Sequence, residues 1–275
     1  MEIKTVRALW FSPTGNAERI AVTAARTLSE RFPAPLDTLS LNRPEVRKHE
    51  YAFTPTDFLV FACPVYAGRL PNRILPDIKA CLRGDNTPAA ALVTFGNRAF
   101  DNALAELVSV LTDNGFRVVG AGAVVGEHAF TDKLGGGRPG VTDLRALRTF
   151  AETIAAAVRN GTASGVTVPG DPAAPYYVPK GVDGLPARFL KAKPKVDLSR
   201  CHNCGTCARV CPMGAIDPGN VSDVPGTCIK CQACVSRCTR RARFFDDPAF
   251  LSHVAMLERT FTEPKENAFF YGGLT

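Results

Sequence analysis

The sequence lacks an apolar run long enough to cross a membrane as a helix, which takes about 20 residues. The longest candidate is DFLVFACPVYAG at residues 57–68, where Pro64 interrupts the run and a glycine ends it. A stretch this short, bounded by turn residues, predicts a buried strand followed by a loop. We therefore expect no membrane span.

Two other signals are missing. The opening residues, MEIKTVRALW, show no secretory signal, so we expect a cytoplasmic protein whose cysteines stay reduced. No GxGxxG motif follows a predicted strand, so direct binding of NAD(P)H is not expected.

Acidic side chains are in the minority, with 26 Asp and Glu against 33 Lys and Arg and a formal net charge of +7. No base-reading fold or interleaved stacking aromatics accompany the basic residues, so nucleic-acid binding is not expected. A cluster of arginines stands near residue 240. Its role is either docking of an acidic partner or compensation of cofactor charge, and the sequence leaves both open. Its members are Arg237, Arg240, Arg241 and Arg243.

Ten cysteines are present, and eight of them form two runs with the spacing CxxCxxCxxxC. The second run repeats the first after 27 residues, from position 201 to position 228. This spacing is typical of paired 4Fe-4S clusters. A zinc ribbon needs only four ligands per metal, and a disulfide framework needs an oxidising compartment, so both are disfavoured. The predicted metal ligands are Cys201, Cys204, Cys207, Cys211, Cys228, Cys231, Cys234 and Cys238.

In the bacterial two-cluster pattern, the last cysteine of each run ligates the other cluster. The expected sets are Cys201, Cys204, Cys207 and Cys238 for the first cluster, and Cys228, Cys231, Cys234 and Cys211 for the second. Residues 194–245 resemble two-cluster ferredoxins of the clostridial type, including CPMGAID after the first run, although Thr239 stands where the second run usually has proline. Cys63 and Cys81 fall outside the runs and are expected to be inert buried thiols.

The chain opens with a strand, a short loop and an amphipathic helix over residues 6–28. Hydroxyl groups and backbone N–H groups in the loop SPTGNA, beside the positive end of a helix dipole, suit a phosphate dianion. Ordinary capping of the helix by the same residues is the alternative.

Further strands and helices are expected to alternate along the first half of the chain. The strands are expected near residues 36–41, 57–63, 89–95 and 117–125, and the helices near 72–82, 101–114 and 142–159. This alternation predicts an α/β fold with a doubly wound, parallel, five-stranded sheet, followed by a small α+β domain that carries the cysteine runs. The loops SPTGNA, PVYAGRLP and GNRAFDN should then converge at the carboxyl ends of the strands.

With these three loops, residues 3–160 resemble flavodoxins, and the resemblance implies that FMN binds there. The implied cofactor-binding residues are Ser12, Thr14, Gly15, Asn16, Ala17, Pro64, Val65, Tyr66, Ala67, Gly68, Gly96, Asn97, Arg98 and Phe100. Ala17 departs from the family, which usually has a hydroxyl residue there. Tyr66 either stacks on the flavin or packs in its loop, and Phe100 either does the same or packs in the core.

Two further loop residues, Arg98 and His128, each have two possible interpretations. Arg98 either reaches the flavin or a partner, or is a solvated loop cation, and His128 either delivers a proton to the flavin or is an ordinary loop histidine.

The whole chain resembles fused flavodoxin–ferredoxin proteins of anaerobic prokaryotes. The expected parts are a flavodoxin-like FMN domain (1–162), a Pro/Gly-rich connector (163–193), a two-cluster ferredoxin-like domain (194–246) and a C-terminal helix and tail (247–275). The resemblance implies electron transport between FMN, two 4Fe-4S clusters and a protein redox donor and acceptor, with no catalytic residue assigned. The alternatives are a flavin-dependent reductase of a small-molecule substrate and an oxygen-sensing regulatory protein.

Overall fold

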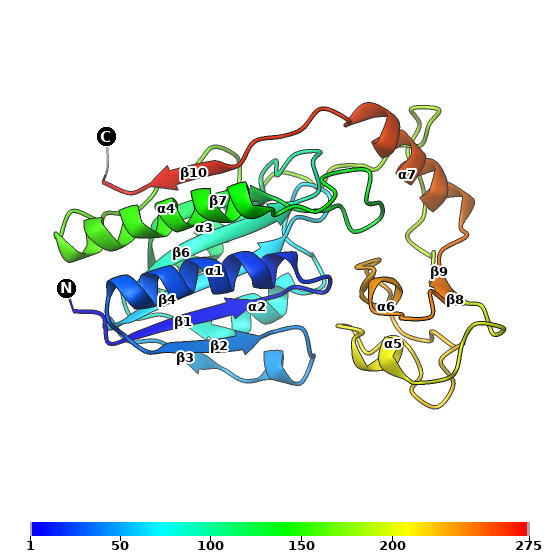
Figure 1. The fold of residues 1–275 in the computed structure, drawn as a ribbon, viewed down its shortest axis with the longest axis horizontal. Helices are drawn as coiled ribbons and strands as arrows, with labels where there is room; N and C mark the ends of the chain where they lie inside the picture. The colour runs from blue at the N-terminus through cyan, green and yellow to red at the C-terminus, as the bar shows by residue number, and fades with distance from the viewer. Residues whose placement is uncertain (1, 274–275) are drawn as a thin grey trace.

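The computed structural model describes residues 2–273, so residue 1 of the first expected domain and residues 274–275 of the expected tail lie outside the described part. Helices cover both faces of a central sheet, and a smaller unit rich in loops stands beside one end of that sheet (Figure 1). Within residues 2–273, none of the helices combines the length and the hydropathy that crossing a bilayer would take.

The central sheet has six strands, of which five are parallel. In spatial order they are β10 (Ala268–Tyr271), β7 (Phe116–Val125), β6 (Thr87–Phe95), β4 (Asp57–Pro64), β1 (Thr5–Trp10) and β2 (Leu36–Ser40). The five parallel strands follow the order 2-1-3-4-5 that is characteristic of flavodoxin-like folds. The α/β class and the parallel sheet predicted from the sequence are confirmed.

Four helices bury the two faces of the sheet. They are α1 (Asn16–Arg31) and α4 (Val141–Arg159), which share one apolar core, and α2 (Leu75–Cys81) and α3 (Ala103–Asp113), which share the other. The spacing of Ile20, Ala24 and Leu28 gives α1 the apolar stripe that faces the sheet. A short 3-10 helix, η1 (Val46–Lys48), and the two-stranded sheet of β3 (Tyr51–Ala52) and β5 (Leu82–Arg83) complete this unit.

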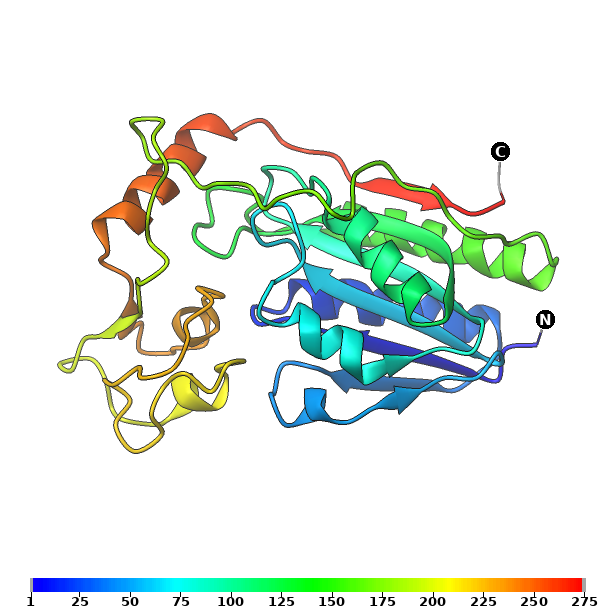
Figure 2. The ribbon, with the colours of Figure 1, turned by 180° about the vertical axis from the view of Figure 1, so that it is seen from behind.

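The predicted five-stranded sheet is one strand short, because β10 returns from the far unit and pairs antiparallel with β7 (Figure 2). The ring of Phe269 stacks on Phe150 with 4.9 Å between centroids. Gly120 and Gly122 of β7 make this packing possible, since a Cβ at Gly122 would lie 2.9 Å from the Phe269 ring. A four-residue edge strand whose partner is distant in sequence leaves little local signal.

The smaller unit contains β8 (Lys195–Val196), α5 (Thr206–Arg209), α6 (Ala233–Ser236) and β9 (Arg243–Phe244). After it comes α7 (Pro248–Thr260), which begins at the predicted place: the Asp247 side chain accepts a hydrogen bond of 2.9 Å from the Phe250 N–H. Phe250 packs with Phe189 of the connector, whose ring centroid lies 5.5 Å away.

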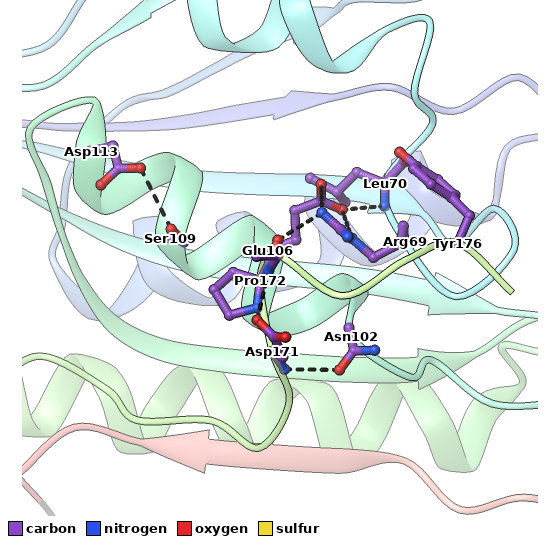
Figure 3. Close-up of polar contacts among 10 residues, drawn as sticks. Arg69, Leu70, Asn102, Glu106, Ser109, Asp113, Asp171, Pro172 and Tyr176 are labelled. Atoms are coloured by element: carbon purple, nitrogen blue, oxygen red, sulfur yellow. Dashed lines mark hydrogen bonds and ion pairs between the residues drawn. The ribbon is translucent and has the colours of Figure 1, made fainter.

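The connector lies along the loops of the sheet unit (Figure 3). The Tyr176 hydroxyl donates to the Leu70 carbonyl at 2.8 Å, and the Arg69 guanidinium donates to the Pro172 carbonyl at 2.7 Å. The Asp171 N–H donates to the Asn102 side chain at 2.8 Å. These contacts fix the connector to the sheet unit.

Candidate redox site

The two cysteine runs adopt the same backbone, 27 residues apart. Residues with positive φ recur in three pairs: Asn203 (54°) and Lys230 (56°), Gly205 (71°) and Gln232 (63°), and Gly214 (57°) and Arg241 (49°). A non-glycine residue in this region costs about 1 kcal/mol, so the repeated conformation needs a common cause. The helices α5 and α6 follow at the same offset, and the runs form equivalent loops.

Backbone N–H groups donate to cysteine sulfurs in the same repeated pattern. The pairs are Asn203 to Cys201 (3.4 Å) and Lys230 to Cys228 (3.4 Å), then Ala215 to Cys211 (3.3 Å) and Ala242 to Cys238 (3.3 Å). Such bonds stabilise thiolates and tune the potential of an iron–sulfur cluster.

A cavity in this unit is lined by the four cysteines expected to hold the second cluster, with apolar side chains around them. These cysteines are Cys211, Cys228, Cys231 and Cys234. Burial raises the pKa of Cys231 far above its ordinary value and that of Cys234 to about 12, and the neighbouring thiols act in the same direction. Such thiols stay protonated unless a metal replaces the proton, so this donor set suits metal ligation.

The cysteines of the first run lie nearer the surface. Cys204 is exposed, and a hydrogen bond with the Thr206 hydroxyl is the main cause that lowers its pKa. Cys201 and Cys207 are half-buried and pack on a small core around Ile216. Among residues 2–273, no three His, Cys, Asp or Glu side chains converge on a single metal ion. In a cubane cluster each cysteine binds a different iron, so its ligands stand farther apart.

The cavity wall is also the interface with the sheet unit. Met213 and Ile229 line the cavity and pack against the core of the sheet. The buried Arg47 guanidinium donates to the Pro212 carbonyl at 2.8 Å and pairs with Asp77 at 2.7 Å. The cysteine unit therefore faces the carboxyl ends of the parallel strands (Figure 1).

The first predicted cofactor loop meets the cysteine unit at Gly15, whose φ is 105°. A Cβ built on Gly15 would lie 3.5 Å from Nη2 of Arg237, which comes from the second cysteine run. Within the described residues the Arg237 guanidinium forms no hydrogen bond or ion pair, and Gly15, the N-cap residue of α1, has no side chain to cap the helix. The Ser12 hydroxyl accepts from the Glu18 N–H at 2.9 Å, so it supports the helix backbone.

The second loop is a tight turn in which Tyr66 and Arg69 exchange backbone hydrogen bonds of 2.8 and 3.1 Å. Its central residues, Ala67 and Gly68, have φ of 48° and 77°, as a type I′ turn requires. The pKa of Tyr66 is raised well above its ordinary value by burial and then by the thiols of Cys231, Cys63 and Cys228. Tyr66 thus lies on the side of the second cysteine run.

In the third loop, the Asn97 side chain has partners within the protein. The Asn97 side chain donates to the carbonyls of Phe261 (2.7 Å) and Glu263 (3.1 Å) and accepts from the Lys265 N–H (2.9 Å). Its side-chain amide therefore binds the segment between α7 and β10, and its backbone N–H donates to the Phe95 carbonyl at 3.2 Å. No local sequence signal marks this contact, since its partners are more than 160 residues away.

The other side chains of this loop also have partners within the protein. The Phe100 ring packs on Phe95 with 5.5 Å between centroids, which favours the core interpretation. Arg98 forms an ion pair with Asp101 and lies 4.2 Å from the ring centroid of Tyr177, so it is not a freely solvated cation.

His128 is neutral at physiological pH. Burial lowers its pKa to about 4, with the charges of His253 and Arg98 adding to the effect. Its Nδ1 accepts from the Phe130 N–H at 3.1 Å, and its ring lies against Gly96. These contacts favour the loop histidine over a proton donor. Burial likewise raises the pKa of Cys63, and that of Cys81 to about 11, as expected for inert thiols.

The shift at His128 predicts a dependence of stability on pH. Because the folded pKa lies below the unfolded value of about 6.5, the unfolded chain binds the proton more readily, and stability falls as pH drops from 6.5 towards 4. We expect up to about 2 kcal/mol of this loss between pH 7 and pH 5, and His128→Asn should remove it. Urea unfolding at both pH values measures the effect. The exposed His49→Asn serves as the control, and an equal pH slope in all three proteins would contradict the prediction.

Comparison with known proteins identifies part of the chain. Residues 194–217 match the family described as 4Fe-4S binding domain. The first cysteine run lies inside this match, so the chain carries at least one 4Fe-4S binding site. No match was found among curated proteins.

Several solved structures are similar to the sheet unit. A flavodoxin from the domain Archaea has 13% identity and a TM-score of 0.40, over 57% of this chain and 99% of its own. Flavodoxin 2 from Bacillus cereus has 14% identity and a TM-score of 0.38, over 56% and 98%. The apo form of the NADH:FMN oxidoreductase EmoB has 18% identity and a TM-score of 0.41, over 56% and 89%.

Proposed function

We propose that this protein is an intracellular electron-transfer protein that relays electrons between two 4Fe-4S clusters and an FMN. The observation that carries the proposal is a shared wall: Met213 and Ile229 line the cavity of four cysteines and also pack against the sheet core, beside the predicted flavin loops. An iron–sulfur site separated from a flavin site by one layer of side chains is suited to direct electron transfer.

The residues present fit both groups. Eight cysteines stand on two equivalent loops, and backbone N–H groups donate to four of their sulfurs. At the first flavin loop, positive φ at Gly15 keeps a side chain away from the start of α1, whose N–H groups suit a phosphate. When bound, FMN supplies chemistry that couples one-electron and two-electron steps, while the clusters carry single electrons.

Different groups of the protein have different roles in this proposal. The cysteines would hold the clusters, the backbone N–H groups of both runs would stabilise their negative charge, and Tyr66 of the second flavin loop lies on the side of the second run. The exposed Cys204 brings the first cluster to the surface, where a protein redox partner can reach it. In this arrangement Cys204 would hold the first cluster near a redox partner, and Cys231 would hold the second cluster near Tyr66 of the second flavin loop.

Cofactor analysis tests the proposal. Protein purified or reconstituted without oxygen should contain about eight irons, eight sulfides and one FMN per chain. Its clusters should be reduced and reoxidised together with the flavin in a stopped-flow experiment. A chain that binds about two zinc ions, or that binds clusters but no flavin, would show that the proposal is wrong.

Arg237 gives a second, more local prediction. Its unpaired guanidinium lies at the phosphate loop, where Ala17 lacks the hydroxyl group usual in the resembling family. A hydrogen bond to a charged group contributes about 1.5 kcal/mol or more, so Arg237→Gln should weaken FMN binding about tenfold. Riboflavin, which has no phosphate, should bind both proteins equally. Fluorescence titration of the flavin measures both affinities.

The matched control is Arg240→Gln, which removes an exposed arginine from the same cluster of arginines. This variant should bind FMN as the wild type does. An equal loss for riboflavin and FMN in Arg237→Gln would instead indicate damage to the loop and contradict a contact with the phosphate.

A further inference from the structure

Arg243 breaks the symmetry of the internal repeat. It stands 27 residues after Ile216, at the equivalent place behind the second cysteine run. Both side chains are buried, each with an exposed fraction of 3%. The first half of the repeat thus places an apolar side chain where the second half places a guanidinium, and the fold alone does not require the charge.

The guanidinium of Arg243 lies at the small core in which cysteines of both runs pack. Its Nη2 donates to Sγ of Cys207 at 3.4 Å and to the Val221 carbonyl, and its Nη1 donates to the Pro194 carbonyl at 3.5 Å. Cys234 of the second run packs in the same small core as Val221 and Cys207. Cys207 belongs to the first expected cluster and Cys234 to the second, so one cation faces both.

This cation has no anionic side chain as a partner. Among residues 2–273, no Asp or Glu forms an ion pair with Arg243, and its buried Nε has no hydrogen-bond partner. A buried charge without a counter-charge destabilises a protein by several kcal/mol. Within residues 2–273, the group bound to Arg243 that can become negative is the Cys207 sulfur, and a cluster held there would carry a net charge of about −2.

We propose that Arg243 is the shared counter-ion of the two clusters and raises the reduction potential of both. The inference rests on the proposed function, since it requires both clusters. Adding an electron makes a cluster more negative, so a buried cation stabilises the reduced form relative to the oxidised form. The effect is larger for the first cluster, because Arg243 donates a hydrogen bond directly to the Cys207 sulfur. Since one charge serves both clusters, it also reduces their mutual repulsion when both are reduced.

Redox titration of the holoprotein tests this role. Arg243→Met keeps much of the length and removes the charge, whereas Arg243→Lys keeps the charge and alters the hydrogen bond. We expect the Met variant to lower both potentials. At a fixed applied potential, its ratio of reduced to oxidised first cluster should fall about tenfold, equal to 59 mV for a one-electron couple. The Lys variant should lie between the wild type and the Met variant.

Electron paramagnetic resonance at each applied potential separates the two clusters. Arg240→Met is the matched control, because it removes an exposed arginine from the same segment and should change the ratio less than threefold. If Arg243 had only a structural role, its substitution would change the stability of the protein and would leave the reduction potentials of the assembled clusters unchanged.

The outcomes separate this inference from the proposed function. If the Met variant assembles both clusters with unchanged potentials, Arg243 is not their counter-ion. If the Met variant loses its clusters, the Lys variant decides: assembly of both clusters with potentials at or slightly below those of the wild type supports the counter-ion, because the charge is kept, and loss of the clusters in the Lys variant as well overturns it. A wild type that holds only one cluster would overturn the two-cluster function itself, and the shared counter-ion with it.

Discussion

Replacing Glu106 with alanine should lower the free energy of unfolding by about 3 to 5 kcal/mol, the usual result of breaking a buried ion pair. Glu106 and Arg69 are both buried, with exposed fractions of 3% and 9%. Two hydrogen bonds of 2.9 and 2.5 Å join their side chains, and the same carboxylate accepts from the Leu70 N–H at 2.8 Å (Figure 3). The substitution leaves the guanidinium buried without a counter-charge.

The position of this pair extends its effect beyond stability. Arg69 closes the tight turn of the second flavin loop and also holds the connector through the Pro172 carbonyl. Glu106→Ala should therefore also release the connector, and proteolysis between residues 163 and 193 should become faster. Urea unfolding in the absence of oxygen measures the stability, and a timed digestion measures the release.

Two further variants show whether charge is the cause. The exposed pair of Arg31 and Glu152 is the control, since Glu152→Ala should cost less than about 1 kcal/mol. The double variant Arg69→Met with Glu106→Leu removes both charges and should recover part of the lost stability. If the double variant is less stable than Glu106→Ala by the full cost of a second substitution, the two side chains are not coupled.

Local patterns in the sequence predicted the sheet well. The continuous apolar run of β4 and the alternation of strands with helices required only neighbouring residues, and the observed strands begin and end within about two residues of the predicted ones. The cysteine spacing is equally local, because each run places its ligands on one loop. The internal repeat was visible in the sequence and returns as paired backbone conformations.

Contacts between distant segments could not be predicted in this way. The Asn97 amide holds a segment more than 160 residues away, and β10 joins β7 across the whole cysteine unit. Neither contact has a motif of its own. Alignment of the two halves of the 27-residue repeat could have singled out Arg243, because the equivalent residue in the first half is Ile216.

The four arginines near residue 240 form one cluster in the sequence but have different surroundings in the structure. The sequence left open whether they dock a partner or offset cofactor charge. Arg243 is buried against the cysteine sulfurs and Arg237 lies at the phosphate loop, so both are placed to offset charge within the molecule. Arg240 and Arg241 remain exposed and are the members still available to a partner.

The second large effect concerns the exchange of ligands between the runs: Cys238→Ala should abolish the cluster of the first run. Cys211 lies with Cys228, Cys231 and Cys234 around one cavity. The repeat places Cys238 at the equivalent position, and the Ala242 N–H binds its sulfur as the Ala215 N–H binds that of Cys211. By this symmetry Cys238 completes the other set, and the variant should retain about four irons.

Matched variants identify which cluster is lost without any assumption about spectra. Cys204→Ala removes a ligand that belongs to the first set in either assignment, and Cys231→Ala does the same for the second. We expect the spectrum of Cys238→Ala to match that of Cys204→Ala, and the spectrum of Cys211→Ala to match that of Cys231→Ala. The reverse pairing would mean that each run holds its own cluster. In that case the shared cavity would reflect packing of Cys211 and not ligation, since the cluster would have formed without its sulfur.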